Sequence, residues 1–513
     1  MASIETQLAP RNDDMMTRKP RLLAISVDGG TPSRAAESFA QYLGVCKVRA
    51  LPSVFPSSTA PSHASFSTGT HPSKHGIVGN RFWELESVDQ IAAIQAQPLA
   101  AVAPYSLDSL LVKSWALEAS LLGYQVAAVN FPQTVAFRGN LRGSFPAVYC
   151  LYAPPRKLLL DYSGSVSNAR IDLFGIKLEF QVDTFGLVRI VVCNGIDSTV
   201  IDERGIVTLD YDRYRLSVPV QYDSTRGALF LGKSILETYD HPQSVMREVS
   251  QSVMREVSAY APPLPTRTYS GTTTTFIEAP SVEWTENTAL RAIERLNPSV
   301  LLVRFVQTDH AQEALYGDSV SSNPVARLQA MRRITETYDL VGASIARLIS
   351  SWEGEHVIVF SDHGIDTVAR YLRPNTVLKS LGLDGRLIFS GDSNCGYLYG
   401  CSQPGDLAVI DWALNESSDG AMRLARPSDL SAGLAIPQIS PRTGCAQVIS
   451  TQHTELVYEP GPASEIVRYA SHGYDPRVPA MNGFVVAPRF APKFRDITAL
   501  GRWCRALIVG EKS

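Results

Sequence analysis

Three short apolar segments, each followed by an aspartate, constrain the fold of this 513-residue chain more than any other feature. They are RLLAISV before Asp28, SVLLVRFVQT before Asp309 and VIVFS before Asp362. Continuous runs of Val, Ile and Leu are typical of parallel strands that are buried on both faces. Ligands bind beyond the carboxyl ends of such strands, so we expect the three aspartates to converge on one crevice. Carboxylates gathered in this way repel each other unless cations lie between them, which favours a metal site.

The composition narrows the classes of function. The chain carries a net charge of −3, so no global basic field attracts it to a nucleic-acid polymer or an acidic membrane surface. No apolar run approaches the ~18 residues that a membrane span requires, and residues 1–19 lack the apolar core of a signal peptide. The seven cysteines are scattered without a CxxC pair, which favours reduced thiols. We therefore predict a cytoplasmic protein without membrane association, and no pattern indicates its oligomeric state.

The alternation of residue types divides the chain into a core and two insertions. Apolar runs alternate with helical patterns in three separate stretches, which predicts one α/β core. Segments such as KLEFQVDT and YRLSVPVQYD favour antiparallel strands, and a later stretch rich in Gly, Ser and Pro favours an irregular cap. The predicted parts are a flexible tail at 1–19, the core at 20–146, 275–387 and 460–513, a β-rich insertion at 147–274, and a cap insertion at 388–459.

The β-rich insertion also contains a tandem duplication. QSVMREVS occurs from Gln243 to Ser250 and again from Gln251 to Ser258. A period of eight fits neither a heptad nor an eleven-residue repeat. We predict that the duplication lengthens one surface helix by about two turns, without a function of its own.

The loop at residues 55–80 carries the densest set of candidate catalytic groups. It is rich in hydroxyl side chains and ends in Gly-Ile-Val-Gly-Asn. Pro61 suits the first turn of a helix, which would place Thr59 near the helix N-terminus, beside free N–H groups and positive partial charge. Such a loop can surround an anion with a hydroxyl, a helix N-terminus and an amide side chain. The residues alone do not choose the nucleophile among Thr59, Ser57, Ser58 and Ser62.

The order of the motifs resembles one known family. After Asp28 come Thr59-Ala60-Pro61-Ser62-His63 and His75-Gly76-Ile77-Val78-Gly79-Asn80, then Asp309, Ser361-Asp362-His363-Gly364 and His472-Gly473-Tyr474-Asp475. This set resembles the alkaline phosphatase superfamily, specifically the nucleotide pyrophosphatase/phosphodiesterase branch (type I phosphodiesterases). The resemblance implies an α/β fold with an alkaline-phosphatase-like, mostly parallel central sheet flanked by helices. It covers nearly the whole core but neither insertion.

The resemblance also implies a two-metal hydrolase. One divalent metal would be held by Asp28, Thr59, Asp362 and His363, and the other by Asp309, His472 and one further ligand. Mixed Asp and His ligands suit zinc, with manganese or iron as alternatives. Thr59 would be the nucleophile that forms a covalent phospho-enzyme, and Asn80 would donate a hydrogen bond to a phosphoryl oxygen. The expected substrate is a phosphodiester or a nucleotide pyrophosphate, in a nucleotide or another small phosphorylated metabolite.

One position departs from the family pattern. The family has a metal-binding histidine four residues after the aspartate that corresponds to Asp309, and this chain has Glu313 there. Residues i and i+4 share a helix face, so Glu313 could ligate in the place of the histidine, or His310 could reach in after a shift of the loop. A degraded site is the third alternative, and it would leave a metal-impaired binding protein instead of an enzyme.

Two aromatic residues beside the loop are candidates for substrate contact. Phe82 and Trp83 follow Asn80, and they would either stack on a base or aryl leaving group or pack in the core. We expect His63 and His75 to hydrogen-bond the loop and not to bind metal. The resemblance also allows a phosphomonoesterase, a phosphonate hydrolase or a phosphoryl transferase on the same site.

Overall fold

The structure, a computed structural model, describes most of the chain. The described residues are 20–43, 47–84, 103–137, 144–153, 156–163, 166–174, 176–183, 188–192, 198–201, 204–223, 225, 227–250, 255–257, 276–278, 280–400, 403, 405–437, 441–488 and 491–510. The predicted tail at 1–19 lies outside these ranges. Within them, no helix combines the length and the apolar character that crossing a bilayer requires.

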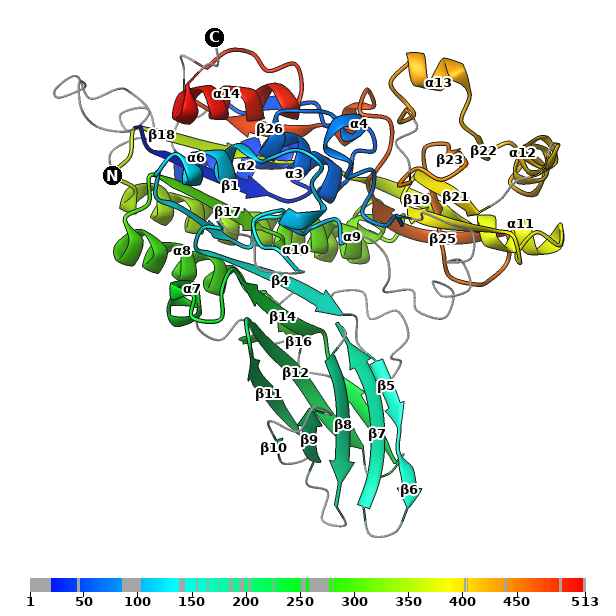
Figure 1. Ribbon diagram of the computed structural model, residues 1–513, viewed down its shortest axis with the longest axis horizontal. Coiled ribbons are helices and arrows are strands. Elements are labelled where there is room, and N and C mark those ends of the chain that lie inside the picture. The colour runs from blue at the N-terminus through cyan, green and yellow to red at the C-terminus, as the bar shows by residue number, and fades with distance from the viewer. Residues whose placement is uncertain are drawn as a thin grey trace.

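The core is a long sheet with parallel strands at its centre (Figure 1). Five neighbouring strands run parallel, in the order β18 (His356–Phe360), β1 (Leu22–Val27), β17 (Val300–Phe305), β3 (Val126–Val129) and β4 (Ala147–Ala153). Beyond β18 the sheet ends with two antiparallel strands, β26 (Gly483–Val486) and β2 (Arg49–Leu51). This arrangement confirms the predicted α/β fold with a mostly parallel centre.

Helices cover both faces of the parallel strands and complete a three-layer core. One face packs against α2 (Pro32–Leu43), α8 (Val282–Leu296), α9 (Gln307–Ser319) and α10 (Pro324–Ser351), and the other against α3 (Thr59–Thr68), α6 (Trp115–Leu121) and α14 (Ile497–Val509). Alternation along β1 explains the layering, because Leu23 and Ile25 pack with the first group and Leu22 and Ala24 with the second. Both faces of β1 are therefore buried, which is why the strand is a continuous apolar run.

The carboxyl ends of three parallel strands are level, and this places the candidate site. β1 pairs with β17 on one side and with β18 on the other, with Val27 opposite Phe305 and Ser26 opposite Phe360. The backbone N–H of Asp28 donates to the carbonyl of Phe305 at 2.9 Å, which extends the ladder by one residue. The segments that follow these strands therefore start at one edge of the sheet, as predicted.

The central sheet continues from β4 into the β-rich insertion without a break. The next strands are β14 (Ser234–Tyr239), β12 (Tyr214–Asp223), β13 (Ala228–Leu231) and β5 (Arg156–Leu159), with β11 (Arg204–Tyr211) paired to β12. A second sheet is formed by β6 (Asp161–Ser163), β7 (Val166–Leu173), β8 (Ile176–Val182), β9 (Val188–Val192) and β10 (Ser198–Ile201). Apolar side chains of both sheets share one hydrophobic core. Figure 1 shows these strands projecting from the core as an arm, and their pairing is antiparallel as predicted.

The segment at 388–459 is more regular than we predicted from its composition. Its four-stranded antiparallel sheet contains β20 (Leu387–Asp392), β21 (Cys395–Gly400), β23 (Ala446–Ser450) and β22 (Met422–Leu424), beside α11 (Pro374–Ser380), α12 (Asp406–Ser417) and α13 (Pro427–Ser431). A second sheet joins it to the core through β24 (Thr454–Leu456), β19 (Asp366–Leu372) and β25 (Ser464–Ser471). Gly391 and Gly396 face each other across β20 and β21, where a Cβ on Gly391 would lie 2.3 Å from the Cα of Gly396. The prediction was wrong because these glycines allow close contact inside a sheet and do not mark a loop.

The prediction that the duplicated octapeptide lengthens one helix was also wrong. The first copy forms the five-residue helix α7 (Val245–Val249), in which Met246 and Val249 are buried. In the second copy, Arg255–Val257 form β15, which pairs antiparallel with β16 (Phe276–Glu278). Residues 251–254 and 258 of this copy lie outside the described ranges. Identical sequences adopt two structures here because tertiary burial and a strand partner outweigh the weak local preference of eight residues.

A buried hydrogen-bond chain connects the end of α7 to the arm. The hydroxyl of Tyr239 lies 2.8 Å from the hydroxyl of Ser250 and donates to Glu237 Oε1 at 3.1 Å. Glu237 is fully buried, and burial raises the pKa of its carboxyl to about 7, although the charge of Arg215 acts in the opposite direction. The folded protein therefore favours the protonated form of Glu237.

We predict that Glu237 makes the free energy of unfolding fall as pH rises from about 5 to about 8. A carboxyl whose pKa is raised by folding contributes fully below its unfolded pKa, and the contribution is lost as pH rises through the folded value. Glu237→Gln should remove on the order of 3 kcal/mol of this decline. Urea unfolding across a pH series measures it, with the exposed Glu294→Gln as the control. Parallel pH profiles for the wild type and Glu237→Gln would contradict the prediction.

Candidate functional site

The three strand-end aspartates meet at one edge of the sheet, as the sequence predicted. Asp28 follows β1 directly, and Asp362 comes two residues after β18. Asp309 lies in the first turn of α9, the helix that begins just after β17. All three side chains are buried. The carboxylates therefore face each other in an environment that water screens poorly.

Two groups of these residues have the geometry to hold a metal ion. In each group, one ligand atom per residue lies within 4.8 Å of the others, and the groups are Asp28, Asp362 and His363, and Asp309, His363 and His472. The rings of His363 and His472 lie 4.0 Å apart between centroids, so the two groups are adjacent. The structure therefore places the side chains predicted for the two metals in two neighbouring clusters.

Thr59 lies beside the first of these groups. It is the first residue of α3, and its Oγ1 is 3.1 Å from His363 Nε2 and 3.5 Å from Asp28 Oδ1. The N-terminus of α3 carries positive partial charge, which stabilises an oxyanion at this position. The Thr59 hydroxyl is thus placed between a metal-capable group and a helix N-terminus.

The neighbouring serines, which the residues alone left as alternatives, point elsewhere. Ser57 donates to the carbonyl of Val54 at 3.1 Å, and the hydroxyl of Ser62 lies 2.7 Å from that of Ser53. Ser58 is the N-cap residue of α3 and is 1% exposed. Of these four hydroxyls, only that of Thr59 belongs to a residue that lines the cavity of the site.

Asn80 is held in place with its amide toward the same cavity. Its Oδ1 accepts a hydrogen bond from the backbone N–H of Ala60 at 2.8 Å. The amide NH₂ is left to donate elsewhere, and Asn80 lines the cavity together with Thr59. The bond to Ala60 fixes Asn80 relative to Thr59, because the two residues Thr59 and Ala60 are consecutive in α3.

Glu313, and not His310, lies beside the second metal-capable group. Glu313 Oε1 is 3.8 Å from His472 Nε2. His310 faces away from His472, with its Nδ1 3.4 Å from Lys233 Nζ and its ring edge-on to Tyr152. The i, i+4 relation on α9 thus directs Asp309 and Glu313 to the same side of the helix.

The carboxylates of the site oppose each other's ionisation. Burial raises the pKa of Asp309 well above its ordinary value, and the nearby charge of Glu313 raises it further. Burial likewise raises the pKa of Glu313 to about 8. Burial also acts to raise the pKa of Asp362, but the adjacent His363 and His63 outweigh it and lower that pKa. A cation between these groups would remove the conflict.

Buried atoms without a partner test whether the residues fit a metal. Asp309 Oδ1 and His472 Nδ1 are buried and have no hydrogen-bond partner among the described residues. Such orphaned polar atoms are costly unless a ligand satisfies them. Both belong to one metal-capable group, and their oxygen and nitrogen donors match the preference of zinc. The donor set therefore fits two divalent ions.

The close approach of Asp309 depends on Gly29. Gly29 has a φ of +61°, and a Cβ built on it would lie 2.5 Å from Asp309 Oδ1. Only glycine adopts this backbone region freely and leaves room for the carboxylate. Residue 29 must therefore be glycine, because the carboxylate of Asp309 occupies the space that a side chain would need.

His63 and His75 hydrogen-bond within the loop, as predicted. His63 Nε2 lies 2.8 Å from Ser26 Oγ, and its Nδ1 lies 2.9 Å from the carbonyl of Thr59. His75 Nδ1 accepts from the backbone N–H of Ile77 at 3.1 Å. Burial lowers the pKa of His75 to about 3, so this ring is neutral and can accept that bond.

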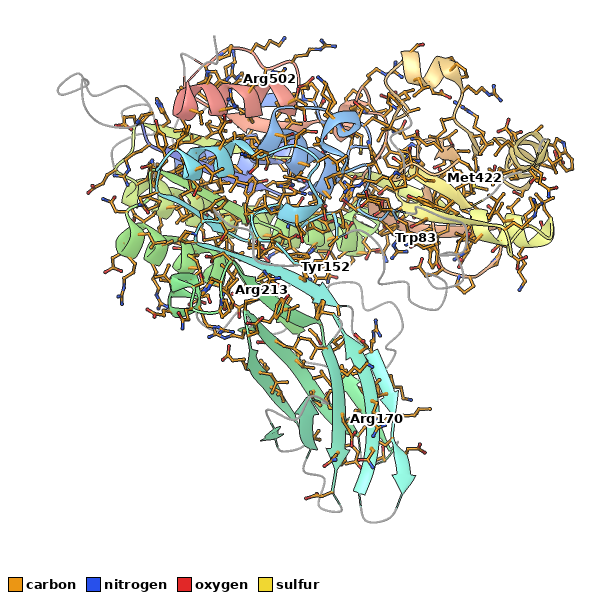
Figure 2. All side chains as sticks on the ribbon, in the orientation of Figure 1. Trp83, Tyr152, Arg170, Arg213, Met422 and Arg502 are labelled. Atoms are coloured by element: carbon orange, nitrogen blue, oxygen red, sulfur yellow. The ribbon has the colours of Figure 1, made fainter. Side chains whose placement is uncertain are left out.

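Of the two alternatives for Phe82 and Trp83, the structure supports core packing and not stacking on a base. Phe82 is 0% exposed and Trp83 is 2% exposed. The ring of Trp83 packs against Tyr399 and Tyr458 of the cap, and its backbone N–H donates to the hydroxyl of Tyr399. Figure 2 marks Trp83 where the core meets the cap. These aromatics fasten the loop to the cap and are out of reach of a substrate.

Our reading of the sequence missed Arg304, the last residue but one of β17. Its Nε donates to Asp28 Oδ2 at 3.0 Å, its Nη2 donates to the same oxygen, and its Nη1 donates to the hydroxyl of Tyr149 at 3.3 Å. The side chain is buried, and the residue lines the same cavity as Thr59. An arginine inside the apolar run SVLLVRFV was the signal, because unpaired charges are rarely buried.

Thr59, Asn80, Asp309, Glu313 and His472 line one cavity of about 280 Å³. Its wall toward the β-rich arm is formed by Tyr149 and Tyr152 of β4, with Tyr105 stacked on Tyr149 at 5.9 Å between centroids. Its wall toward the cap includes Asp392 and Glu455. Asp309 and His472 therefore share the cavity with both aromatic and acidic side chains.

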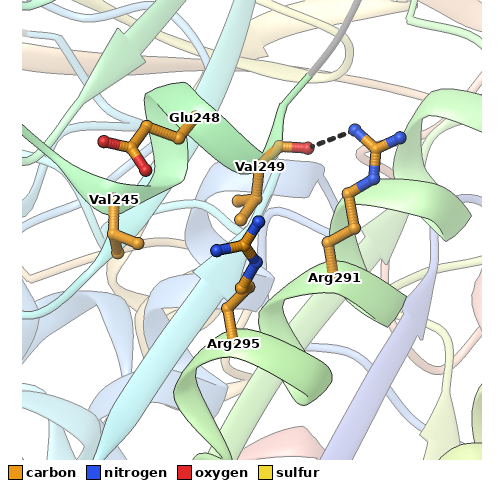
Figure 3. Close-up of a pocket in the computed structure, with 5 residues that line it drawn as sticks. All are labelled: Val245, Glu248, Val249, Arg291 and Arg295. Atoms are coloured by element: carbon orange, nitrogen blue, oxygen red, sulfur yellow. Dashed lines mark hydrogen bonds between the residues drawn. The ribbon is translucent and has the colours of Figure 1, made fainter.

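A second cavity, of about 320 Å³, lies between α7 and α8 (Figure 3). It is lined by Val245, Glu248, Val249, Arg291 and Arg295. Arg291 donates to the carbonyl of Val249 at 3.2 Å. Because α8 ends next to the start of β17, this cavity lies toward the opposite edge of the sheet from the aspartates. The candidate nucleophile Thr59 and the metal-capable Asp309 and His472 line the first cavity and not this one.

Comparison with known proteins agrees with this geometry. The family described as type I phosphodiesterase / nucleotide pyrophosphatase matches residues 22–475. The chain belongs to this family. It is therefore a hydrolase that acts on phosphodiester or pyrophosphate bonds. A search of curated proteins by sequence found no match.

Solved structures of family members share the fold. The murine and human ectonucleotide pyrophosphatase / phosphodiesterase 5 have TM-scores of 0.52 and 0.53 to this chain, each at 13% identity and covering 95% of both chains. An inactive threonine-to-alanine variant of the murine protein, in complex with AMP, has a TM-score of 0.52 at 12% identity, covering 96% of this chain and 95% of that one. At this identity the likeness establishes the fold.

We predict that Gly29→Ala removes one of two bound metals. The new Cβ would displace Asp309 Oδ1, and the positive φ adds strain of about 1–3 kcal/mol. Metal analysis of the purified variant should give a stoichiometry near one where the wild type gives two. Gly385→Ala is the control, because a Cβ there meets nothing within 4 Å. Wild-type metal content in Gly29→Ala would contradict this dependence.

Proposed function

We propose that the protein hydrolyses a phosphodiester or nucleotide pyrophosphate bond with Thr59 as the nucleophile and two divalent metal ions as cofactors. The observation that carries the proposal is the position of the Thr59 hydroxyl, 3.1 Å from His363 and 3.5 Å from Asp28, in the cavity of the site. Membership in the family supports the class of reaction.

The donor set suggests how two zinc ions would be held. Asp28, Asp362 and His363 with Thr59 would hold one, and Asp309, His472 and Glu313 would hold the other. Bound there, the ions would lower the pKa of the Thr59 hydroxyl and of a water molecule and neutralise charge on the phosphoryl oxygens. We assign Glu313 and not His310 to the second group because Glu313 is the one that reaches His472.

Each step then uses groups of this chain. Thr59 Oγ attacks phosphorus, a Thr59–phosphorus bond forms, and the bond to the leaving oxygen breaks. The N-terminus of α3 and the Asn80 amide stabilise the charge that develops on the non-bridging oxygens. A water oxygen then attacks the phosphothreonyl group, the bond to Thr59 Oγ breaks, and the phosphate monoester leaves.

A nucleotide is the substrate class that the cavity supports best. Tyr105, Tyr149 and Tyr152 line the same cavity as Thr59, and aromatic side chains suit contact with a base. The AMP complex of the murine relative supports the same class. Phosphomonoesterase, phosphonate hydrolase and phosphoryl transferase activities, the metal-impaired binding protein, and the cytoplasmic location stay predictions from the sequence.

We predict that Thr59→Ala lowers turnover of bis(p-nitrophenyl) phosphate by at least about 10³-fold while the variant keeps its fold and both metals. The reason is that the substitution removes the nucleophilic oxygen, while Asp28, Asp362 and His363 remain to hold the first metal. Stopped assays of zinc-loaded protein and metal analysis measure the two quantities. Ser58→Ala is the matched control and should retain activity. Full activity of Thr59→Ala would end the proposal.

We predict that alanine substitutions at Glu313 and at His310, the two candidates for the last ligand of the second metal, change the metal content differently. Glu313→Ala should lower the metal stoichiometry from two toward one, because it removes the oxygen beside His472. His310→Ala should keep two metals, because that ring faces Lys233 and Tyr152. The opposite pattern would assign the ligand to His310, and it would show that the loop rearranges on metal binding.

A further inference from the structure

Arg304 is a buried charged side chain, and its burial calls for a physical reason. A guanidinium in a buried strand is costly to desolvate unless a counter-ion pairs with it. Arg304 is 6% exposed and pairs with Asp28. Among the described residues that line the cavity, it is the one with a permanent positive charge.

The two carboxylate oxygens of Asp28 contact different groups. Oδ1 faces Thr59 Oγ1 and His363 Nε2, each at 3.5 Å, and it is the oxygen on the metal-capable side. Oδ2 accepts from both Nε and Nη2 of Arg304. The two donors converge on this one oxygen, which anchors Oδ2 at the guanidinium and leaves Oδ1 turned toward Thr59 and His363. Arg304 therefore orients the oxygen that Asp28 presents to a metal.

The charges of the site show why a cation is needed there. Asp28, Asp309, Asp362 and Glu313 carry four negative charges when ionised, and two divalent ions would only neutralise them. Imidazoles that ligate a metal are neutral. Asp392 and Glu455 add further acidic groups to the same cavity. Without another cation, the metal-loaded site would not attract an anionic phosphoryl group.

Lys233 is the other cation near the site, but it is placed differently. Its Nζ lies 4.2 Å from the centre of the Tyr152 ring and 3.4 Å from His310 Nδ1. Lys233 is not among the residues that line the cavity, whereas Arg304 lines it and donates directly to Asp28. Of these two cations, Arg304 is thus the one that shares the cavity with Thr59.

We propose that Arg304 is a positioning residue whose charge offsets part of the excess negative charge of the metal-loaded site and so favours binding of a phosphoryl anion. The inference rests on the proposed function, because the charge count assumes two divalent ions. A Coulomb field acts in proportion to ligand charge, so a dianion depends on Arg304 more than a monoanion does.

The test is calorimetric titration of the zinc-loaded full-length protein at pH 8 with inorganic phosphate, a dianion, and with dimethyl phosphate, a monoanion. Arg304→Gln should weaken phosphate binding by at least about tenfold and dimethyl phosphate binding by clearly less. Arg304→Lys, which keeps the charge, should stay within about threefold of the wild type for phosphate. Arg291→Gln, which removes a distant arginine (Figure 3), should bind both anions as the wild type does.

The outcomes separate this inference from the proposed function. Unchanged phosphate affinity in Arg304→Gln, or equal losses for both anions, would overturn the role of Arg304. If Arg304→Gln does not fold, loss of phosphate binding in folded, zinc-loaded Arg304→Lys would overturn it as well. A wild-type protein that binds neither zinc nor phosphate would instead overturn the proposed function.

Discussion

Repulsion among buried carboxylates is the constraint on which the rest of this structure depends. Asp28, Asp309 and Asp362 are held at one sheet edge, where burial raises the pKa of the first two. A flexible scaffold would let them separate, but β1 is hydrogen-bonded on both sides and packed between two helix layers. The core thus offsets a local cost that a functional site requires. Gly29 belongs to the same arrangement, because it gives Asp309 the room to approach.

The parts of the site that follow from strand geometry were predictable from the sequence. A parallel strand buried on both faces must be an apolar run, and its carboxyl end must open toward the crevice, so Asp28 and Asp362 could be placed without coordinates. Thr59 needed more, because the serines beside it have the same chemistry. The family pattern selected Thr59 as the candidate. In the structure the hydroxyls of Ser57 and Ser62 contact Val54 and Ser53, and Ser58 does not line the cavity.

The predictions that failed concern features that depend on contacts between distant segments. Trp83 is buried by Tyr399 and Tyr458, more than 300 residues later, and no local pattern contains that information. The duplicated QSVMREVS shows the same limit directly, since one sequence is a helix in α7 and a strand in β15. The glycines in β20 and β21 indicated a loop, but in the structure they allow these two strands to approach each other closely. Each failure is a case in which tertiary packing overrides local preference.

The two insertions differ in what they bring to the cavity, and this difference decides how a substrate can lie. β4, where the sheet passes into the arm, supplies the aromatic wall with Tyr149 and Tyr152, and the cap supplies Asp392 and Glu455. An anionic phosphoryl group near Thr59 is repelled by the acidic wall. An apolar, stackable group is favoured against the aromatic wall. Under the proposed function, a nucleotide would therefore lie with its base against the aromatic wall and its phosphoryl group away from the carboxylates of the cap.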